Sequence, residues 1–225
     1  MESKSLITVN GRAGLCITPD ATLINLSLEK VLTTNEEASQ MATSYLKKIG
    51  DIMENSGLDR GLPKTTHFSI NKSYHSVYKD GAYTGEQELE GYKLTLHIQI
   101  ELDVNNELLT RIVHGIGQHL QDMDINISFS VKDSQSYQLR LLENAVKDAI
   151  EKARVMAAAA GCTLGQVASI EYPKSEWEYI SRRRNALPQA SLVSFEFESG
   201  SFDFTPEAIE VHEDVTIQWY LIENN

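Results

Sequence analysis

The stretch that most constrains the fold is a long helical pattern between Ser134 and Gly161. It has no proline and no internal glycine, and its apolar residues recur at spacings of three and four, which places them on one face of a helix. Asp133 or Ser134 would cap its start and Gly161 would end it. At about 1.5 Å per residue the helix is roughly 40 Å long, so a broad sheet must cover its alanine-rich face. The predicted apolar stripe comprises Leu142, Ala145, Val146, Ala149, Ile150, Ala153, Met156, Ala157 and Ala160.

Four further stretches alternate apolar and polar residues strictly enough to predict strands. They cover residues 22–32, 66–78, 92–103 and 125–131. In each stretch one side is apolar, and the other side carries mainly Ser, Thr, Asn, Gln or His. The strands of a doubly wound parallel sheet would be apolar on both sides, so the pattern favours a largely antiparallel sheet with one buried face. With all helices packed on that face, the chain is predicted to be a two-layer α+β protein.

The order of these elements predicts a ferredoxin-like core. Between residues 22 and 131 the chain is expected to form strand, helix, strand, strand, helix and strand, which is the split βαβ arrangement. The first helix would begin at Thr34, where Glu37 completes a capping box, and the second would cover 106–120. Residues 79–91 contain the turn chemistry of a hairpin with a long tip.

The other elements are predicted to extend this core within a single domain of residues 1–225. Residues 173–205 are expected to form an irregular surface excursion. The added elements are the long helix, a first strand at 6–9 that Gly11 and Gly14 would break, and strands at 166–172 and 209–221.

Composition disfavours some classes of partner. The net charge is −12, from 20 Lys and Arg against 32 Asp and Glu, whereas binding to nucleic acid or anionic lipid relies on clustered cations. No stretch approaches the roughly 20 apolar residues of a membrane span. The first residues lack the apolar segment of a secretory signal, so we expect a cytoplasmic protein for the chain as given, and a periplasmic one if a leader has been removed. Cys16 and Cys162 are interpreted as small, partly buried thiols.

The polar side of the predicted sheet admits two interpretations. It is either a solvated surface or a contact between copies of the chain, because hydroxyl and amide groups can be desolvated when they pair across an interface. Exposed sheet edges would offer a second route to assembly, by strand addition. The residues expected on this side are Asn25, Ser27, Ser69, Asn71, Ser73, Thr95, His97, Gln99, Asn126, Ser128, Thr216 and Gln218.

Three histidines lie on the polar side of the predicted hairpin strands: His67, His75 and His97. Depending on the register, His97 would lie opposite or diagonal to His75. A metal site there would need a third ligand, for which Glu101 is the candidate. The competing interpretation is that these are isolated imidazoles on a wet sheet.

The 173–205 excursion concentrates aromatic and arginine residues. Its guanidinium groups could bind a phosphate or an acidic partner, or could form a solvated loop that balances an acidic chain. Its aromatic residues could form a satellite core under the loop or anchor an interaction. The predicted interaction surface comprises Trp177, Tyr179, Arg182, Arg183, Arg184, Phe195, Phe197, Phe202 and Phe204.

Four segments together resemble the SIMPL-domain family: ITVNGRAGLCITPDATLINLSLE, EGYKLTLHIQIEL, KARVMAAAAGCTLGQVASI and PEAIEVHEDVTIQWYLIE. This family contains bacterial periplasmic and surface-associated immunogenic proteins and a vertebrate signalling adaptor. The resemblance implies an α+β fold, no established enzymatic activity, and, in some bacterial relatives, assembly into large hollow rings or cylinders. It also implies an association with envelope or oxidative-stress physiology. It supplies no catalytic residues, and the 173–205 excursion has no match in it.

The sequence contains no phosphate-binding glycine loop and no HExxH, CxxC or GxSxG motif, so it predicts no enzyme, catalytic residue or cofactor. We therefore expect a non-enzymatic protein that assembles into a homo-oligomer and presents the 173–205 segment to a protein partner. The alternative is a small-ligand or metal-binding protein that uses a pocket between helices and sheet, or the strand histidines.

Overall fold

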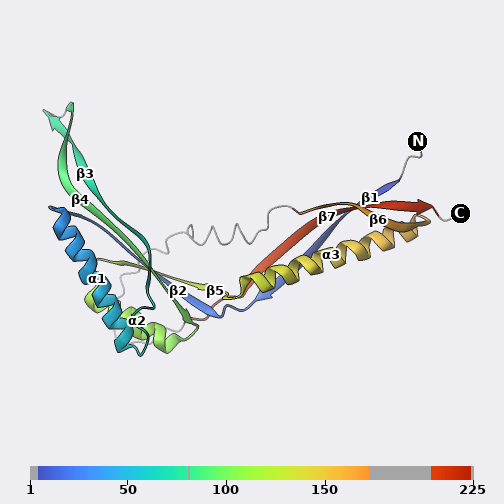
Figure 1. The fold of residues 1–225 in the computed structure, drawn as a ribbon, viewed down its shortest axis with the longest axis horizontal. Coiled ribbons are helices and arrows are strands. Elements are labelled where there is room, and N and C mark those ends of the chain that lie inside the picture. Colours follow the sequence, from blue (N-terminus) through green and yellow to red (C-terminus); the bar gives the residue numbers. More distant parts are fainter. Residues whose placement is uncertain (1–4, 81, 173–203, 224–225) are drawn as a thin grey trace. The chain divides into compact units, whose positions relative to one another are not determined.

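The computed structural model describes residues 5–80, 82–172 and 204–223, which contain seven strands and three helices (Figure 1). The protein is therefore α+β, as predicted. The described residues fall into two compact units: unit 2 contains residues 20–130 with 204–205, and unit 1 contains the rest. None of the described helices is long and apolar enough to cross a membrane.

Unit 2 has the predicted ferredoxin-like order. Its four strands form one sheet in the order β3-β4-β2-β5, and every neighbouring pair is antiparallel. The two helices lie between strands in the chain, which makes the split βαβ arrangement. The elements are β2 (Ala21–Leu32), α1 (Asn35–Asn55), β3 (Lys64–Lys79), β4 (Ala82–Asp103), α2 (Asn106–His119) and β5 (Asp124–Ser130).

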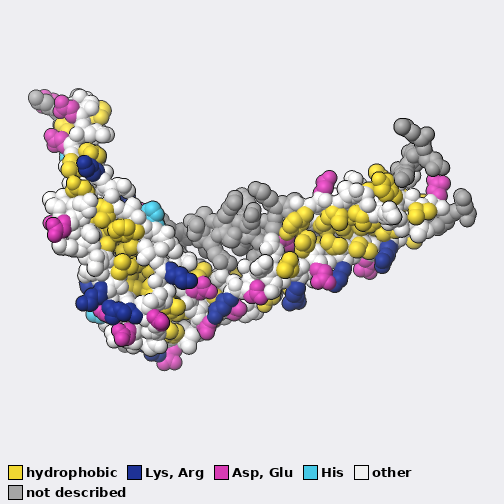
Figure 2. Space-filling view, in the orientation of Figure 1, with side chains coloured by type: hydrophobic (Ala, Val, Ile, Leu, Met, Phe, Trp, Pro, Cys, Tyr) yellow, Lys and Arg dark blue, Asp and Glu magenta, His cyan; other side chains and the backbone are white. Residues whose placement is uncertain are grey.

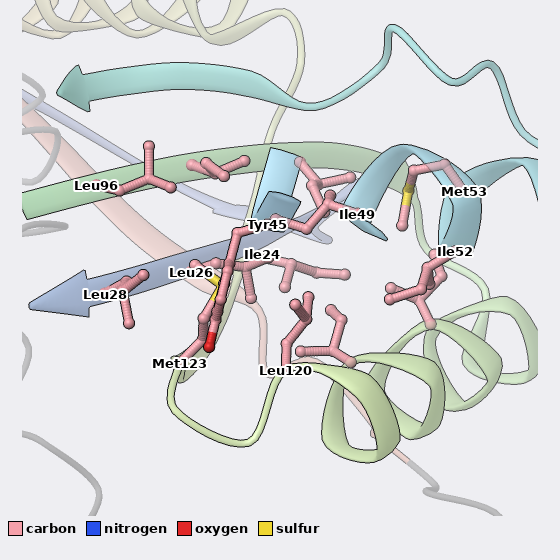
Figure 3. Close-up of a cluster of buried hydrophobic side chains, with 14 of the residues drawn as sticks. Ile24, Leu26, Leu28, Tyr45, Ile49, Ile52, Met53, Leu96, Leu120 and Met123 are labelled. Carbon is pink, nitrogen blue, oxygen red and sulfur yellow. The ribbon is translucent and has the colours of Figure 1, made fainter. Parts of the chain in front are cut away.

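The core of unit 2 lies between one face of this sheet and the two helices (Figure 3). Alternate residues of the central strands β2 and β4 point into it, because successive side chains of a strand face opposite sides. Burying one Leu or Ile fully contributes about 1.5–3 kcal/mol, so this cluster dominates the stability of the unit. Its fully buried members on the sheet are Ile24, Leu26, Leu28, Leu94, Leu96, Ile98 and Ile100.

Helix α1 begins at the predicted capping box. The Thr34 hydroxyl accepts a hydrogen bond from the Glu37 backbone N–H at 3.1 Å, and the Glu37 carboxylate accepts one from the Thr34 N–H at 3.2 Å. The helix is followed by Gly57, whose φ of 82° suits a glycine. The buried face of α1 includes Ala38, Ala42, Tyr45, Ile49, Ile52 and Met53.

Unit 1 has a sheet of its own, in the antiparallel order β1-β7-β6, with one long helix packed on it. The predicted additional strands and long helix are thus present, but they form a second sheet. The elements are β1 (Leu6–Ile17), α3 (Ser134–Ala159), β6 (Cys162–Glu171) and β7 (Ile209–Glu223).

Helix α3 is capped by Asp133, as predicted, and Gly161 beyond its end has a φ of 74°. Its buried stripe differs from the predicted one at both ends. The buried residues recur every four positions, beginning at Leu141, whereas Met156 is 51% exposed and Ala160 is exposed. Residues spaced by four lie along one narrow line of the helix, and four of these five are alanines. Because the alanine side chains are small, α3 can approach its sheet closely. The stripe is Leu141, Ala145, Ala149, Ala153 and Ala157.

The prediction that Gly11 and Gly14 break the first strand is wrong. Strand β1 runs through both glycines and pairs with β7 along its whole length. A Cβ atom at Gly11 would overlap the Ala145 carbonyl oxygen and lie 2.7 Å from the Ala149 Cβ atom. The glycine therefore leaves room for the helix backbone instead of ending the strand.

The long hairpin tip predicted for residues 79–91 is also wrong. Strand β3 continues to Lys79 and β4 begins at Ala82, so the strands extend almost to the turn. Asp80 at the turn has a positive φ of 52°, which an aspartate tolerates. Residues 83–90 are all exposed, which is why this segment lacks the alternation of apolar and polar residues seen elsewhere.

Candidate interaction surface

The outer parts of β3 and β4 form a two-stranded hairpin that no third strand joins among the described residues. Strand β2 pairs with β4 only from Ala21 opposite Asp103 to Leu32 opposite Tyr92. Beyond Tyr92, β4 pairs with β3 alone, up to Lys79 opposite Ala82. We call residues 73–79 and 82–91 the β3–β4 arm; it extends past α1 in Figure 1.

The arm exposes large apolar side chains. Tyr74 and Leu89 are directly opposite each other and are 51% and 49% exposed, and Tyr83 near the tip is 54% exposed. Along β3, Tyr74 follows Phe68 and Ile70 at even spacing, so it continues the side of the sheet that faces the core in unit 2. Apolar side chains are visible along this part of the molecule in Figure 2.

The opposite side of the arm is polar. The His75 Nε2 atom lies 3.8 Å from a carboxylate oxygen of Glu88, and the Ser73 hydroxyl donates to Glu90 at 2.8 Å. The arm thus has an apolar side and a hydrogen-bonded polar side. This division is typical of a strand pair whose apolar side contacts another surface.

Unit 1 also exposes apolar side chains, and Figure 2 shows such side chains along this part of the molecule. They lie on α3, near the ends of β1 and β7, and on the edge strand β6, which among the described residues pairs only with β7. Exposed apolar residues are therefore present in both units. Those in unit 1 that are at least 50% exposed are Leu6, Leu139, Val155, Met156, Val167, Ile170 and Ile222.

The predicted polar side exists on the sheet of unit 2, where it is partly hydrogen-bonded to itself. The Gln99 amide donates to Asn25 Oδ1 at 3.0 Å between β4 and β2. Thr216 and Gln218 belong to the other sheet, where Thr216 donates to Asn10 Oδ1 at 2.9 Å and Gln218 accepts from Ser169 at 3.1 Å. The twelve predicted residues are therefore divided between two sheets.

Ion pairs connect elements on both sides of the unit 2 sheet. Lys93 Nζ lies 2.6 Å from a Glu29 carboxylate oxygen, and this hydrogen bond lowers the pKa of Glu29. Lys30 Nζ lies 2.6 Å from Asp122, which also accepts a hydrogen bond from the Tyr45 hydroxyl at 3.2 Å. The hydrogen bond from Lys30 is the main cause that lowers the pKa of Asp122, and burial raises the pKa of Tyr45.

The register of the hairpin resolves the arrangement of the three strand histidines. His97 lies opposite His67, and their ring centroids are 5.4 Å apart. The expectation that His97 lies opposite or diagonal to His75 is wrong, because His75 lies opposite Glu88 on the arm. Glu101 lies opposite Leu23, four residue pairs farther along β2 and β4 from His97. Within the described ranges, no three His, Cys, Asp or Glu side chains are grouped as a metal site.

Eight residues of the predicted interaction surface lie outside the described residues: Trp177, Tyr179, Arg182, Arg183, Arg184, Phe195, Phe197 and Phe202. The ninth, Phe204, is partly buried and packs against the core cluster of unit 2. Its ring centroid lies 6.5 Å from that of Phe129. Both cysteines are free thiols; Cys16 is exposed on β1, and Cys162 is partly buried at the start of β6.

Sequence reasoning missed the β3–β4 arm as a candidate surface. The available signal was the tyrosines of its two strands, Tyr74 and Tyr83, since aromatic residues are enriched at the centres of interfaces. Interpreting 79–91 as a loop tip concealed that Leu89 and Tyr74 are opposite each other.

Comparison with known proteins gives a consistent set of relatives. The SIMPL family model, described as a protein of unknown function (DUF541), matches residues 7–219. The "26 kDa periplasmic immunogenic protein" of Brucella melitensis is 29% identical over 170 residues, which is 73% of this chain and 65% of the relative. The protein of the same name from Brucella abortus has the same identity and coverage. The "Uncharacterized protein YggE" of Edwardsiella ictaluri is 24% identical over 194 residues, covering 84% of this chain and 77% of the relative. This chain thus spans slightly less than two thirds of the length of the two Brucella relatives.

Proposed function

This chain belongs to the SIMPL family, and on that premise we propose that it is a non-enzymatic protein that assembles with copies of itself through the β3–β4 arm. The observation that supports this proposal is the two-stranded arm with an apolar exposed side. A two-stranded hairpin alone is marginally stable in water, and three strands or a packed surface are needed for independent stability. A second copy is the partner that is always available at the concentration of the chain itself.

The apolar pair on the arm supplies a suitable contact. Tyr74 and Leu89 are each about half exposed, and Tyr83 adds a third large side chain near the tip. Aromatic side chains give a large contact area at low entropic cost, and they are enriched among residues that dominate binding energy. Contact with a second copy would remove these side chains from water and would complete the packing of the arm.

A partner protein is a second element of the proposal. The residues proposed to contact it are the eight predicted residues of the 173–205 excursion other than Phe204, from Trp177 to Phe202, because aromatic and arginine side chains together are typical of protein interfaces. We also propose a periplasmic location, which is supported by the names of the two Brucella relatives.

The test is the absolute mass in solution of the untagged chain, measured by light scattering after size exclusion at two concentrations and two salt levels. The proposal expects a discrete multiple of the 25.2 kDa chain mass. The mass should persist at high salt, since an apolar contact is not screened by ions. A chain that stays at 25.2 kDa at all concentrations would overturn the proposal.

A pair of matched variants assigns the contact to one side of the arm. Tyr74→Ser with Leu89→Ser removes the apolar pair, and we expect the dissociation constant of the assembly to rise at least about tenfold. His75→Ser with Glu88→Ser alters the neighbouring cross-strand pair on the other side of the same arm, and should leave the mass unchanged. If both double variants assemble like the unaltered chain, the arm is not the contact.

A further inference from the structure

Independently of assembly, we propose that His67 and His97 form a chelating site for a late first-row divalent transition-metal ion such as Zn²⁺ or Cu²⁺. The site is built on the polar side of the unit 2 sheet, where β3 and β4 pair. It would use the two imidazoles as its protein ligands and leave the other coordination positions to water.

A β-bulge creates this pairing. Lys64 and Thr65 lie opposite Gln99 and Ile98, and the next pair is His67 with His97, so Thr66 is the extra residue. Without the bulge Thr66 would lie opposite His97, and His67 would be turned to the other side of the sheet, because side chains alternate along a strand. The Thr66 hydroxyl donates to the His97 carbonyl oxygen at 3.3 Å and so holds the bulge. Bulges often serve to re-aim a side chain in this way.

The geometry of the two rings fits a shared ion. Their centroids lie 5.4 Å apart, and their planes are inclined by 45°. Two nitrogens at about 2.0–2.1 Å from one tetrahedral metal lie roughly 3.3–3.4 Å apart. Because each ring nitrogen lies off the centroid of its ring, rings at this separation can each turn one nitrogen to a common ion. His97 is half-buried and His67 is exposed, so the site is open to solvent on one side.

The charges around the pair are compatible with a cation. Glu29 is close enough to His97 for the imidazole to contribute to the lowered pKa of this carboxyl, after the larger effect of Lys93. Lys93 is itself paired with Glu29 at 2.6 Å, so its positive charge is compensated. Across the sheet, the row continues from His97 to Ser27 on β2 and to Asp124 on β5. Imidazole is a suitable ligand for zinc, copper and nickel, and copper is expected to bind most tightly.

Three of the other four histidines have described surroundings that differ, which provides controls. His75 lies 3.8 Å from Glu88, His212 lies 3.4 Å from Glu210, and His114 contacts Gln118 at 3.3 Å. Each of these imidazoles has a carboxylate or an amide beside it where the proposed site has a second imidazole. His75 is the closest match, because it lies on the same hairpin and is similarly exposed.

The experiment is calorimetric titration of the untagged chain with Zn²⁺ and with Cu²⁺, with the bound ions counted after dialysis. We expect one ion per chain, and at least about tenfold weaker binding in His67→Asn and in His97→Asn, with the His75→Asn control unchanged. Circular dichroism would show that all variants are folded. Because the titration counts ions per chain, its result does not depend on whether the chain assembles.

A second readout is the melting temperature with and without metal. An ion that binds only the folded state raises it, so the unaltered chain and His75→Asn should gain stability with Zn²⁺, while the double variant His67→Asn with His97→Asn should not. The proposal is overturned if the double variant binds the metal as tightly as the unaltered chain. It is equally overturned if His75→Asn weakens binding as much as His67→Asn does.

Discussion

Gly11 shows how a single residue sets the distance between a helix and a sheet. The glycine lies in β1 under α3, where a Cβ atom would overlap the Ala145 carbonyl oxygen, which belongs to the helix backbone. Backbone cannot rotate away, so a larger residue must push the whole helix outward. The Ala145 and Ala149 side chains, both fully buried, show that the helix is already as close as small residues allow.

We expect Gly11→Ala to lower the free energy of unfolding by about 2 kcal/mol or more, because overpacking a well-packed site typically costs about 1–3 kcal/mol. Urea unfolding followed by circular dichroism measures this. Gly14→Ala is the matched control in the same strand: its Cβ atom would lie 2.8 Å from His212 Nδ1, at the end of a side chain that can move. Equal losses in the two variants would contradict the argument.

Asp122 provides a pH-dependent contribution to stability. Its pKa is lowered from the ordinary value of 3.8, first by the hydrogen bond from Lys30 and then by the charge of Lys30 and the hydrogen bond from Tyr45. A carboxyl whose pKa is lower in the folded chain stabilises the folded state above its unfolded-state pKa. That contribution is lost as the pH falls through the folded-state pKa.

We therefore expect Asp122→Asn to be less stable than the unaltered chain near neutral pH, and the difference to vanish progressively from about pH 5 downward. Urea midpoints measured from pH 7 to pH 2 would show the two curves converging on the acid side. Asp124→Asn, at an exposed position on β5, serves as the control for a change of net charge. A difference that stays constant across this range would show that Asp122 acts by packing instead of charge.

At the level of single residues, local features were predictable and register was not. The Thr34 and Glu37 capping box follows from a spacing of three, so the sequence alone predicts it. The contact of His67 with His97 depends on the bulge at Thr66, which shifts the pairing by one residue. No local pattern in the sequence marks that bulge, and the pairing it sets is between residues far apart in the chain.

Among the elements, α1 illustrates a helix whose start is fixed by two side chains. The capping box satisfies two backbone N–H groups that would otherwise have no partner within the helix. We expect Thr34→Ala to lower the free energy of unfolding by about 1 kcal/mol, as for other caps. Thr33→Ala, one residue earlier and exposed, is the control for a lost threonine and should have a small effect, measured by the same urea titration. If Thr33→Ala costs as much, the capping box is not the cause.

Elements with one buried side were predictable, and elements without one were not. β2 and the inner part of β4 were recognisable because burial imposes an apolar side chain at every second position, from Leu94 to Ile100. In the β4 half of the arm this constraint is absent, because residues 83–90 are exposed, and the sequence there was interpreted as a loop. For α3 the apolar stripe was predicted, but the exact buried face was not. The larger apolar residues Val146 and Ile150 directly follow the buried alanines, so the pattern does not show which member of each pair faces the sheet.

For the whole molecule, the stability of unit 1 is predicted to depend on unit 2 through the chain itself. Residues 20–130 separate β1 from α3, so the packing of these two elements closes a loop of that length. When unit 2 is folded, the ends of this segment are joined, because the Asp20 N–H donates to the Ser130 carbonyl oxygen at 3.1 Å. When unit 2 is unfolded, closing such a loop costs roughly 4–5 kcal/mol.

The sequence predicts a single domain, and this coupling leads us to expect a single unfolding transition. Trp219, buried in unit 1, reports on that unit by fluorescence when Trp177→Phe removes the other tryptophan. Leu96→Ala in the core of unit 2 removes a fully buried side chain at a cost of about 2–5 kcal/mol, and should lower the midpoint reported by Trp219. An unchanged Trp219 midpoint would show that the units unfold independently.

The pairing of β1 with β7 also has a consequence for biosynthesis. β1 is synthesised well before its partner β7, because Ile17 pairs with Ile209 and Leu6 pairs with Tyr220. At about 5–20 residues per second, the roughly 190 residues between them take on the order of 10–40 s to synthesise. Throughout that time β1 lacks its neighbouring strand, and until α3 has been synthesised it also lacks the helix that covers Gly11, so the nascent chain carries an unpaired strand. Such a strand is a site for holdase binding and for premature pairing with another nascent chain.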